Sequence, residues 1–284
     1  MSYTSFADMA NDIRRNAWKV PADVDIIVGV PRSGLLAALM LGEVLNKPVI
    51  DLDGFVAGRE PQAGSRSKLM RHDKRCALIL DDTVYSGGSM KRAREKAQTA
   101  AGFAKMYFGC VYAEGRDACK LVDVFFVNNY NPHEEIWHLY EWNILHHGSR
   151  LSSRCMFDID GVLCKEPPDE RYLDKYLDYI ANAVPMVIPT TEIGALVSFR
   201  LEQYRDITEQ WLKKQGVMYG ALHLCPARNY HDRSMYFNSA AYKAGIYRDA
   251  KWALLFVESD RKQAQEIARL TGKQVFCYED GKMY

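Results

Sequence analysis

The sequence lacks a surplus of charge of either sign, because 37 Lys and Arg residues stand against 36 Asp and Glu residues. It therefore gives no global reason to expect nucleic acid or an anionic membrane as a partner, and any recognition of anions must be local. No CxxC pair occurs, and the seven cysteines are odd in number and widely spaced, which argues against a zinc site and a disulfide framework. The longest apolar run, LLAALML, is too short to span a bilayer.

The N-terminal stretch MSYTSFADMANDIRRNAWKV mixes acids and bases and has no apolar core, so it is not typical of a signal peptide. We expect most of the cysteines to be buried thiols in a reducing compartment. These features predict a soluble, cytoplasmic protein with no membrane partner. The length of 284 residues suggests one large domain or two medium ones.

Short β-branched runs alternate with helical patterns, which is typical of parallel α/β sheets. In the first half, strands are predicted at 25–30, 48–55, 76–82, 105–114 and 122–130, with helices at 34–45 and 89–102. After a polar stretch at 146–155 the cycle restarts, with strands at 156–162, 195–199, 252–258 and 274–279 and helices at 169–183, 202–216 and 261–272. We therefore expect two parallel-sheet α/β domains joined near residue 150.

The predicted strand ALILDD carries two adjacent carboxylates, Asp81 and Asp82, and the small-residue loop SGGS follows at 86–89. In parallel sheets, ligands bind beyond the carboxyl ends of the strands. The loop allows backbone N–H groups at a helix N-terminus to approach an anion, whereas ionised carboxylates suit vicinal hydroxyls. Carboxylates that accept from two neighbouring hydroxyls, next to N–H groups that bind an anion, predict a site for a ribose 5-phosphate. The alternative is a capped helix that follows an acidic loop.

The stretch LILDDTVYSGGSM resembles the 5-phosphoribosyl-1-pyrophosphate (PRPP) motif of type I phosphoribosyltransferases, and GVPRSG (29–34) resembles that family's pyrophosphate loop. The basic stretch 57–75 resembles the mobile loop that closes over PRPP, with Arg66 and Arg71 as further candidate clamps. The resemblance implies a phosphoribosyltransferase domain over 1–148, with PRPP and a nucleobase or nucleotide as partners and Mg²⁺ on the diphosphate. The implied PRPP-binding residues are Arg32, Ser33, Gly34, Arg59, Lys68, Asp81, Asp82, Thr83, Tyr85, Ser86, Gly87, Gly88 and Ser89.

The implied reaction is attack of a base nitrogen on the anomeric carbon of PRPP, with release of pyrophosphate. Asp81 and Asp82 would then act catalytically by stabilising an oxocarbenium-like transition state. The base stays open, because Tyr85 occupies the position where enzymes for 6-oxopurines often carry an Asp. The candidates for stacking on the base, or else for core packing, are Phe125, Phe126, Trp137 and Trp142.

A second acidic pair, Asp158 and Asp160, follows the apolar run in CMFDIDGVLC. Two carboxylates in the pattern Asp-x-Asp at a strand end can flank one metal ion while doing different work. The first can be a nucleophile and the second a general acid or base.

This pattern resembles the first motif of the haloacid dehalogenase (HAD) superfamily, and the other motifs follow in order. Ser198 in ALVSFR would end a strand and bind the phosphoryl group, and Lys243 in AYKAG would neutralise nucleophile and phosphate. The resemblance implies a HAD Rossmann-like phosphatase domain with a minimal cap over 152–284. The implied ligands of Mg²⁺ are Asp158, Asp160 and either Glu258 or Asp260 of LLFVESD, the other of which would cap a helix.

Single members of this set have plainer interpretations. Ser198 could be a turn residue and Lys243 a solvated helix position, with Lys251 as its rival. Arg200 and Arg205 are predicted at the surface rather than in contact with substrate.

Together the two resemblances imply a bifunctional enzyme of nucleotide metabolism. One half transfers a phosphoribosyl group and the other hydrolyses a phosphate ester through an aspartyl-phosphate. The alternatives are a PRPP-binding sensor with a phosphatase output and a nucleic-acid-end phosphatase, against which the neutral net charge argues. A homodimer stays open.

Overall fold

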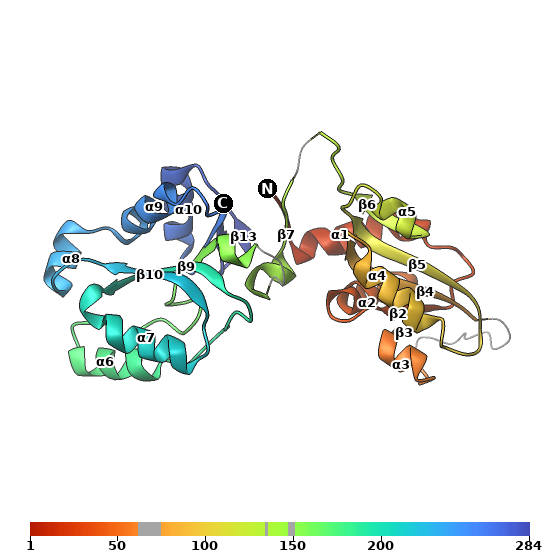
Figure 1. Cartoon of the computed structure of the whole chain (residues 1–284), viewed down its shortest axis with the longest axis horizontal. Helices are drawn as coiled ribbons and strands as arrows, with labels where there is room; N and C mark the ends of the chain where they lie inside the picture. The colour runs from red at the N-terminus through yellow and green to blue at the C-terminus, as the bar shows by residue number, and fades with distance from the viewer. Residues whose placement is uncertain (62–74, 134–135, 147–150) are drawn as a thin grey trace. The chain divides into compact units, whose positions relative to one another are not determined.

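The computed structural model describes residues 1–61, 75–133, 136–146 and 151–284 (Figure 1). The chain divides into two compact units, Met1–His138 and Leu139–Tyr284. This division comes before the boundary predicted near residue 150. The reason is that the 3₁₀ helix η2 (Glu141–His146) packs against η3 (Ser152–Arg154) of the second unit.

The first unit is built on a parallel sheet in the order β3-β2-β4-β5-β6. Its central strands are apolar on both faces, as expected for a parallel sheet covered by helices on both sides. The strands are β2 (Ile26–Gly29), β3 (Val49–Asp51), β4 (Arg75–Val84), β5 (Phe103–Ala113) and β6 (Val124–Asn128). Two further short strands are β1 (Ser2–Thr4) and β7 (His138–Tyr140).

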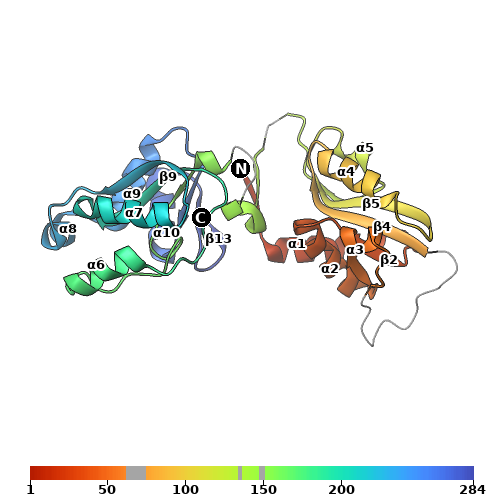
Figure 2. The same ribbon diagram turned by 60° about the horizontal axis from the view of Figure 1, so that its bottom comes forward.

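Figure 2 shows helices on both sides of this sheet. The core on one side joins α3 (Leu52–Val56), α4 (Gly88–Ala97) and α5 (Ala118–Leu121) to the sheet. The helices α1 (Phe6–Asn16) and α2 (Ser33–Leu45) cover the other side, and η1 (Ala17–Lys19) follows α1. A capping box between Ser5 and Asp8 starts α1.

Several predicted strand ends in this unit were wrong, and hydrogen bonds or strand pairing explain two of them. The strand predicted to run to residue 55 ends at Asp51, because the Asp51 side chain accepts from the Gly54 N–H and caps α3. Strand β4 continues to Val84, past Asp81 and Asp82, because its pairing with β5 continues to that residue. The acidic pair therefore lies inside the strand.

The second unit has a six-stranded sheet in the order β10-β9-β8-β11-β12-β13, in which only β13 is antiparallel among the described strands. The order places β8 at the centre, and strands β9 and β11 flank it. The strands are β8 (Cys155–Phe157), β9 (Ile193–Leu201), β10 (Tyr219–Cys225), β11 (Leu255–Glu258), β12 (Val275–Cys277) and β13 (Lys282–Met283).

Two helix pairs sandwich this sheet (Figure 1). One pair is α6 (Leu173–Asn182) and α7 (Arg205–Lys214), the latter preceded by η4 (Glu202–Tyr204). The other pair is α9 (Ser239–Asp249) and α10 (Arg261–Thr271), which share a core with Met156, Val197 and Phe256 of the sheet. A short helix, α8 (Tyr230–Tyr236), precedes α9 and buries none of its residues.

The two parallel-sheet α/β domains predicted from the sequence are confirmed. All seven cysteines are described, and each is a free thiol. Of the helices that the structure describes, none is long and apolar enough to cross a membrane.

Candidate functional site

Asp158 lies immediately after the central strand β8, where the chain enters a tight turn. Its backbone N–H donates to the Val257 carbonyl of β11, and its Oδ1 accepts from the Ile159 N–H at 2.8 Å. Gly161 closes the turn with φ +76°, and a Cβ there would lie 2.4 Å from Ser259. The turn therefore requires glycine and fixes the Asp158 carboxylate at the centre of the sheet's carboxyl edge.

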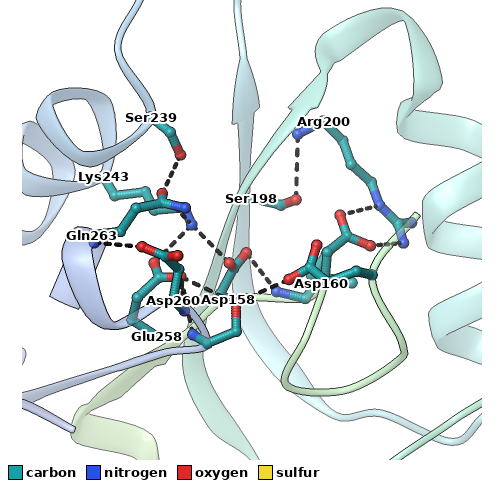
Figure 3. Close-up of polar contacts among 12 residues, drawn as sticks. Asp158, Asp160, Ser198, Arg200, Ser239, Lys243, Glu258, Asp260 and Gln263 are labelled. Atoms are coloured by element: carbon teal, nitrogen blue, oxygen red, sulfur yellow. Dashed lines mark hydrogen bonds and ion pairs between the residues drawn. The ribbon is translucent and has the colours of Figure 1, made fainter. Parts of the chain in front are cut away.

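Lys243 reaches this carboxylate from α9 (Figure 3). Its Nζ lies 2.7 Å from Asp158 Oδ2, 2.7 Å from Glu258 Oε2 and 3.3 Å from Gln263 Oε1. Lys243 is buried, so the alternative of a solvated helix position was wrong. The helix turns this residue inward, where the two carboxylates compensate the cost of burying its charge.

The charges of this buried cluster affect one another. Burial raises the pKa of Asp158 well above its ordinary value, whereas Lys243 lowers it and Glu258 raises it further. Burial alone would lower the pKa of Lys243, but the charges of Asp158 and Glu258 raise it. The ammonium of Lys243 therefore stays protonated across the neutral range.

The structure separates Glu258 from Asp260. Glu258 is fully buried beside Lys243, and its Oε1 accepts from the N–H groups of Ser259 and Asp260. Asp260 instead accepts from the Gln263 N–H at 2.7 Å and caps α10. Glu258 is thus the acid in contact with the Asp158 cluster, and Asp260 has the role of helix cap.

Asp160 forms an ion pair that the sequence did not predict. Arg200 donates from Nε to Asp160 Oδ2 at 2.9 Å and from Nη2 to Oδ1 at 2.6 Å. The prediction of a surface position for Arg200 was wrong, since only 1% of it is exposed. Strand β9 continues to Leu201 and carries Arg200 into the sheet interior.

Ser198 does not end its strand, and that prediction was also wrong because the pairing of β9 continues beyond it. It is fully buried, and its Oγ accepts from the Arg200 N–H at 3.3 Å. Among the described residues, Ser198 is not one of those that line the cavity beside Asp158.

A cavity of about 370 Å³ opens over Asp158, Asp160 and Lys243. Its wall includes Arg233 of α8, whose Nη2 lies 2.6 Å from the buried Glu170. No sequence signal identified this pair, because α8 has no apolar periodicity.

The fit of a divalent cation can be tested on these contacts. No group of three or more acidic, histidine or cysteine side chains among residues 1–61, 75–133, 136–146 and 151–284 is placed to hold a metal ion. Asp160 is bound through both oxygens by Arg200, Asp158 and Glu258 meet Lys243, and Asp260 caps a helix. This arrangement does not fit Mg²⁺, and magnesium stays a prediction from the sequence.

In the first unit, the starts of two helices converge on Asp81. Ser89 of α4 donates from Oγ to Asp81 Oδ2 at 3.1 Å, and Asp81 Oδ1 accepts from the Asp82 N–H at 3.0 Å. A Cβ on Gly34 of α2 would lie 2.7 Å from Asp81 Oδ1, so only glycine fits there. Of the predicted set, the structure thus brings Gly34, Asp81, Asp82 and Ser89 together.

Asp81 and Asp82 are buried, with 6% and 3% of each residue exposed. Burial raises the pKa of Asp81 to about 8, the charge of Asp82 adds to this, and the hydrogen bond from Ser89 opposes it. The pair therefore relieves its mutual repulsion by keeping a proton on Asp81 at neutral pH.

The loop between β4 and α4 turns at Gly87, which has φ +78° and precedes the helix without a side-chain cap. Ser86, Gly87 and Gly88 line a cavity of about 260 Å³ together with Lys91 and Arg94. The sequence did not point to these two cations, although both lie in the first two turns of α4.

The remaining predicted PRPP-binding residues that the structure describes lie in β4, in the loop that follows it, at the start of α2 and after α3. Thr83 is half-buried in β4, while Tyr85 is exposed. Arg32 is exposed and, with Ser33, begins α2, and Arg59 follows α3 and is exposed. Lys68, Arg66 and Arg71 lie outside the described residues.

A larger cavity of about 560 Å³ adjoins the loop in the first unit. Tyr85 and Ser86 line it on one side, and Tyr130, His133 and Ile136 on another. The four aromatic residues named from the sequence do not line it, and Phe126 is buried in the core.

No protein-family model matches the chain, and no curated protein is similar to it in sequence. Solved structures that resemble part of it include a purine phosphoribosyltransferase from Pyrococcus horikoshii Ot3, at 20% identity and a TM-score of 0.34 over 50% of this chain and 93% of that one. A xanthine-guanine-hypoxanthine phosphoribosyltransferase from Helicobacter pylori is 15% identical, with a TM-score of 0.36 over 50% and 93% of the two chains. An orotate phosphoribosyltransferase from Aeropyrum pernix is 18% identical, with a TM-score of 0.31 over 41% and 62%.

Proposed function

We propose that the second unit hydrolyses phosphate monoesters with Asp158 as the nucleophile. The observation that carries the proposal is the buried contact of Lys243 with both Asp158 and Glu258, at 2.7 Å each, on the floor of a cavity. A carboxylate nucleophile needs a fixed position and a nearby cation to offset the charge of the phosphoryl oxygens. The tight turn fixes Asp158, and Lys243 supplies the cation, whose charge opposes the rise in the Asp158 pKa that burial causes.

In the first step an oxygen of Asp158 bonds to phosphorus, the bond to the ester oxygen breaks, and the leaving alkoxide takes a proton from water. In the second step water attacks phosphorus, the bond from phosphorus to the Asp158 oxygen breaks, and inorganic phosphate leaves, which restores Asp158. Asp160, held in place by two hydrogen bonds from Arg200, accepts the proton of that water and passes it to the hydroxide left by the first step. Glu258 keeps Lys243 in position.

Release of inorganic phosphate from 4-nitrophenyl phosphate by the full chain tests this proposal. We expect Asp158→Asn to lose at least about 1,000-fold in kcat, because no other described carboxylate contacts Lys243 from the end of the central strand. Asp260→Asn, which changes only a helix cap, is the matched control and keeps its kcat. Equal activity of Asp158→Asn and wild type would refute the proposal.

For the first unit we propose PRPP binding and phosphoribosyl transfer to a nucleobase. The support is local: the helix starts at Gly34 and Ser89 meet at Asp81, and the loop at 86–89 lines a cavity beside Lys91 and Arg94. Backbone N–H groups and cations suit a phosphate, and the larger cavity adjoining Tyr85 has room for a base.

Because Asp81 and Asp82 are buried, PRPP must displace the loop at 86–89 before its hydroxyls reach them. Calorimetric titration with PRPP, followed by a panel of bases and a pyrophosphate assay, tests the proposal. Binding with pyrophosphate release supports a transferase, binding without release supports the sensor, and no binding refutes both. Salt-dependent binding of oligonucleotides would favour the nucleic-acid-end phosphatase.

A further inference from the structure

Three basic side chains line the cavity above Asp158, and they differ in how many N–H groups already have protein acceptors. Lys243 donates its three N–H groups to two carboxylates and the Gln263 amide oxygen. Arg200 is almost fully buried and donates to Asp160, a threonine hydroxyl and a cysteine sulfur through all three of its nitrogens. Neither side chain has much capacity left for a ligand.

Arg233 of α8 is different. Its Nη1 donates to the Phe199 carbonyl at 2.9 Å, and its Nη2 lies 2.6 Å from Glu170 Oε2. Only the contact with Phe199 is a hydrogen bond, whereas that with Glu170 is an ion pair. Most of the five N–H groups of Arg233 therefore have no hydrogen-bond acceptor in the part of the chain that the structure describes. The guanidinium also lies over the rings of Phe199 and Tyr230, with centroids at 5.1 and 5.6 Å, so its position is fixed. Arg233 is thus a fixed cation with donors available to a ligand.

Strand register places Arg233 away from the reacting group. Phe157, the residue before Asp158, pairs with Leu196 of β9, whereas Arg233 is bound to the carbonyl of Phe199. Phe199 therefore lies about 7 Å further along the sheet than Asp158, at about 3.3 Å per residue. A substrate phosphate bound at Asp158 would thus meet Arg233 through its leaving group.

The charge of the cavity decides what kind of leaving group fits. Three cations line the cavity against five acidic side chains, Asp158, Asp160, Glu166, Asp169 and Glu170. Arg233 already lies 2.6 Å from the carboxylate of Glu170, so a second anion on the leaving group would be repelled by that carboxylate, while neutral acceptor atoms would not. Phe199 and Tyr230 offer flat rings on the same wall.

We infer that Arg233 donates hydrogen bonds to neutral acceptor atoms on the edge of a planar heterocycle held beside Tyr230, so that the substrates of the second unit are nucleoside monophosphates. A guanidinium fork matches paired acceptors on a nucleobase edge. The inference rests on the proposed phosphatase function and names its substrate class and the residue that selects it.

The test compares the full chain acting on guanosine 5′-monophosphate and on ribose 5-phosphate, which lacks the base. We expect wild type to prefer the nucleotide by about 10- to 100-fold in kcat/KM, the range for hydrogen bonds from a charged donor. Arg233→Met abolishes this preference, because its loss in kcat/KM is larger for the nucleotide than for ribose 5-phosphate. Arg205→Met, which removes a partly exposed arginine outside the cavity, is the control and keeps the preference.

Arg233→Met leaves the buried Glu170 without its cation, so the double variant Arg233→Met/Glu170→Gln is measured as well. Its loss of the preference supports the inference even where the single variant folds poorly. Equal rates of wild type on the two esters, or an equal loss on both in the variants, would overturn it and leave the phosphatase proposal intact.

A binding measurement tests recognition of the base independently of ester hydrolysis. Guanosine, which has no phosphate, is titrated into full-length Asp158→Asn by calorimetry, with and without Arg233→Met. Binding that disappears with Arg233→Met supports the inference even where no ester is hydrolysed. The first unit is itself proposed to bind a base, so only the part of the binding that Arg233→Met removes is counted. Binding that is absent, or that loses no part with Arg233→Met, contradicts the inference.

Discussion

Replacing Asp81 by asparagine tests the electrostatics of the first acidic pair. Burial raises the pKa of this carboxyl from 3.8 to about 8. The folded chain therefore holds a proton on Asp81 between about pH 4 and pH 8, where the unfolded chain has lost it. Because the folded state binds the extra proton, its stability falls as pH rises across this window and is constant above it.

The size of the effect follows from the width of the window. About four pH units at about 1.4 kcal/mol per unit correspond to roughly 5 kcal/mol of unfolding free energy. Asp81→Asn has no charge to bury, and the Ser89 hydroxyl that donates to Asp81 can equally accept from an amide. We expect the variant to be more stable than wild type at pH 8.5 and equally stable at pH 4.5.

Urea unfolding of the full chain at half-unit steps from pH 4.5 to 8.5 measures this difference, and a carbon-13 NMR titration of the aspartate carboxyls locates the pKa directly. Glu95→Gln on the exposed side of α4 is the control and leaves the pH dependence unchanged. Two results would contradict the raised pKa of Asp81. One is a wild-type stability that does not fall between pH 5 and 8, and the other is titration of Asp81 near pH 4.

Three further substitutions have expected outcomes. Gly34→Ala should cost about 1–3 kcal/mol in urea unfolding, because its Cβ would lie 2.7 Å from Asp81 Oδ1, and an unchanged midpoint would contradict the close approach. Asp260→Ala should cost about 1 kcal/mol as a lost helix cap with kcat unchanged, and a large fall in kcat would restore it as a site residue. Lys243→Met should cost about 3–5 kcal/mol and abolish phosphate release, since it leaves Asp158 and the buried Glu258 without a cation; retained activity would exclude Lys243 from the site.

The resemblance to the HAD motifs placed Asp158, Lys243 and one of Glu258 and Asp260 in a common site, and strand order explains why two of them meet. Two of these residues directly follow or end neighbouring strands, β8 and β11, so their proximity follows from strand order. Gly34 and Asp81 meet for the same reason. Gly34 begins the helix that follows β2, Asp81 lies near the end of β4, and these two strands pair.

The two arginines of the second site could not be predicted in this way. The sequence predicted that the strand ends before Arg200, whereas β9 includes this residue. Its partner Asp160 is remote in sequence. Arg233 lies on a short helix with no buried residue, so no periodic pattern identified it. Burial of a charge depends on a tertiary partner, which local sequence does not encode.

Strand β10 (Tyr219–Cys225) was also missed. Its sequence, YGALHLC, contains a glycine and a histidine, and as the edge strand it is only partly buried, so neither a continuous apolar run nor a strict alternation appears.

Trapping of the covalent intermediate tests the central claim most directly. The full chain is mixed with a phosphate monoester, quenched in acid within its first turnover and digested, and the peptides are analysed by mass spectrometry. We expect one phosphoryl group on the peptide that contains Asp158, and none on that peptide from Asp158→Asn. A phosphoryl group on another residue, or phosphate release at full rate with none on Asp158, would contradict it.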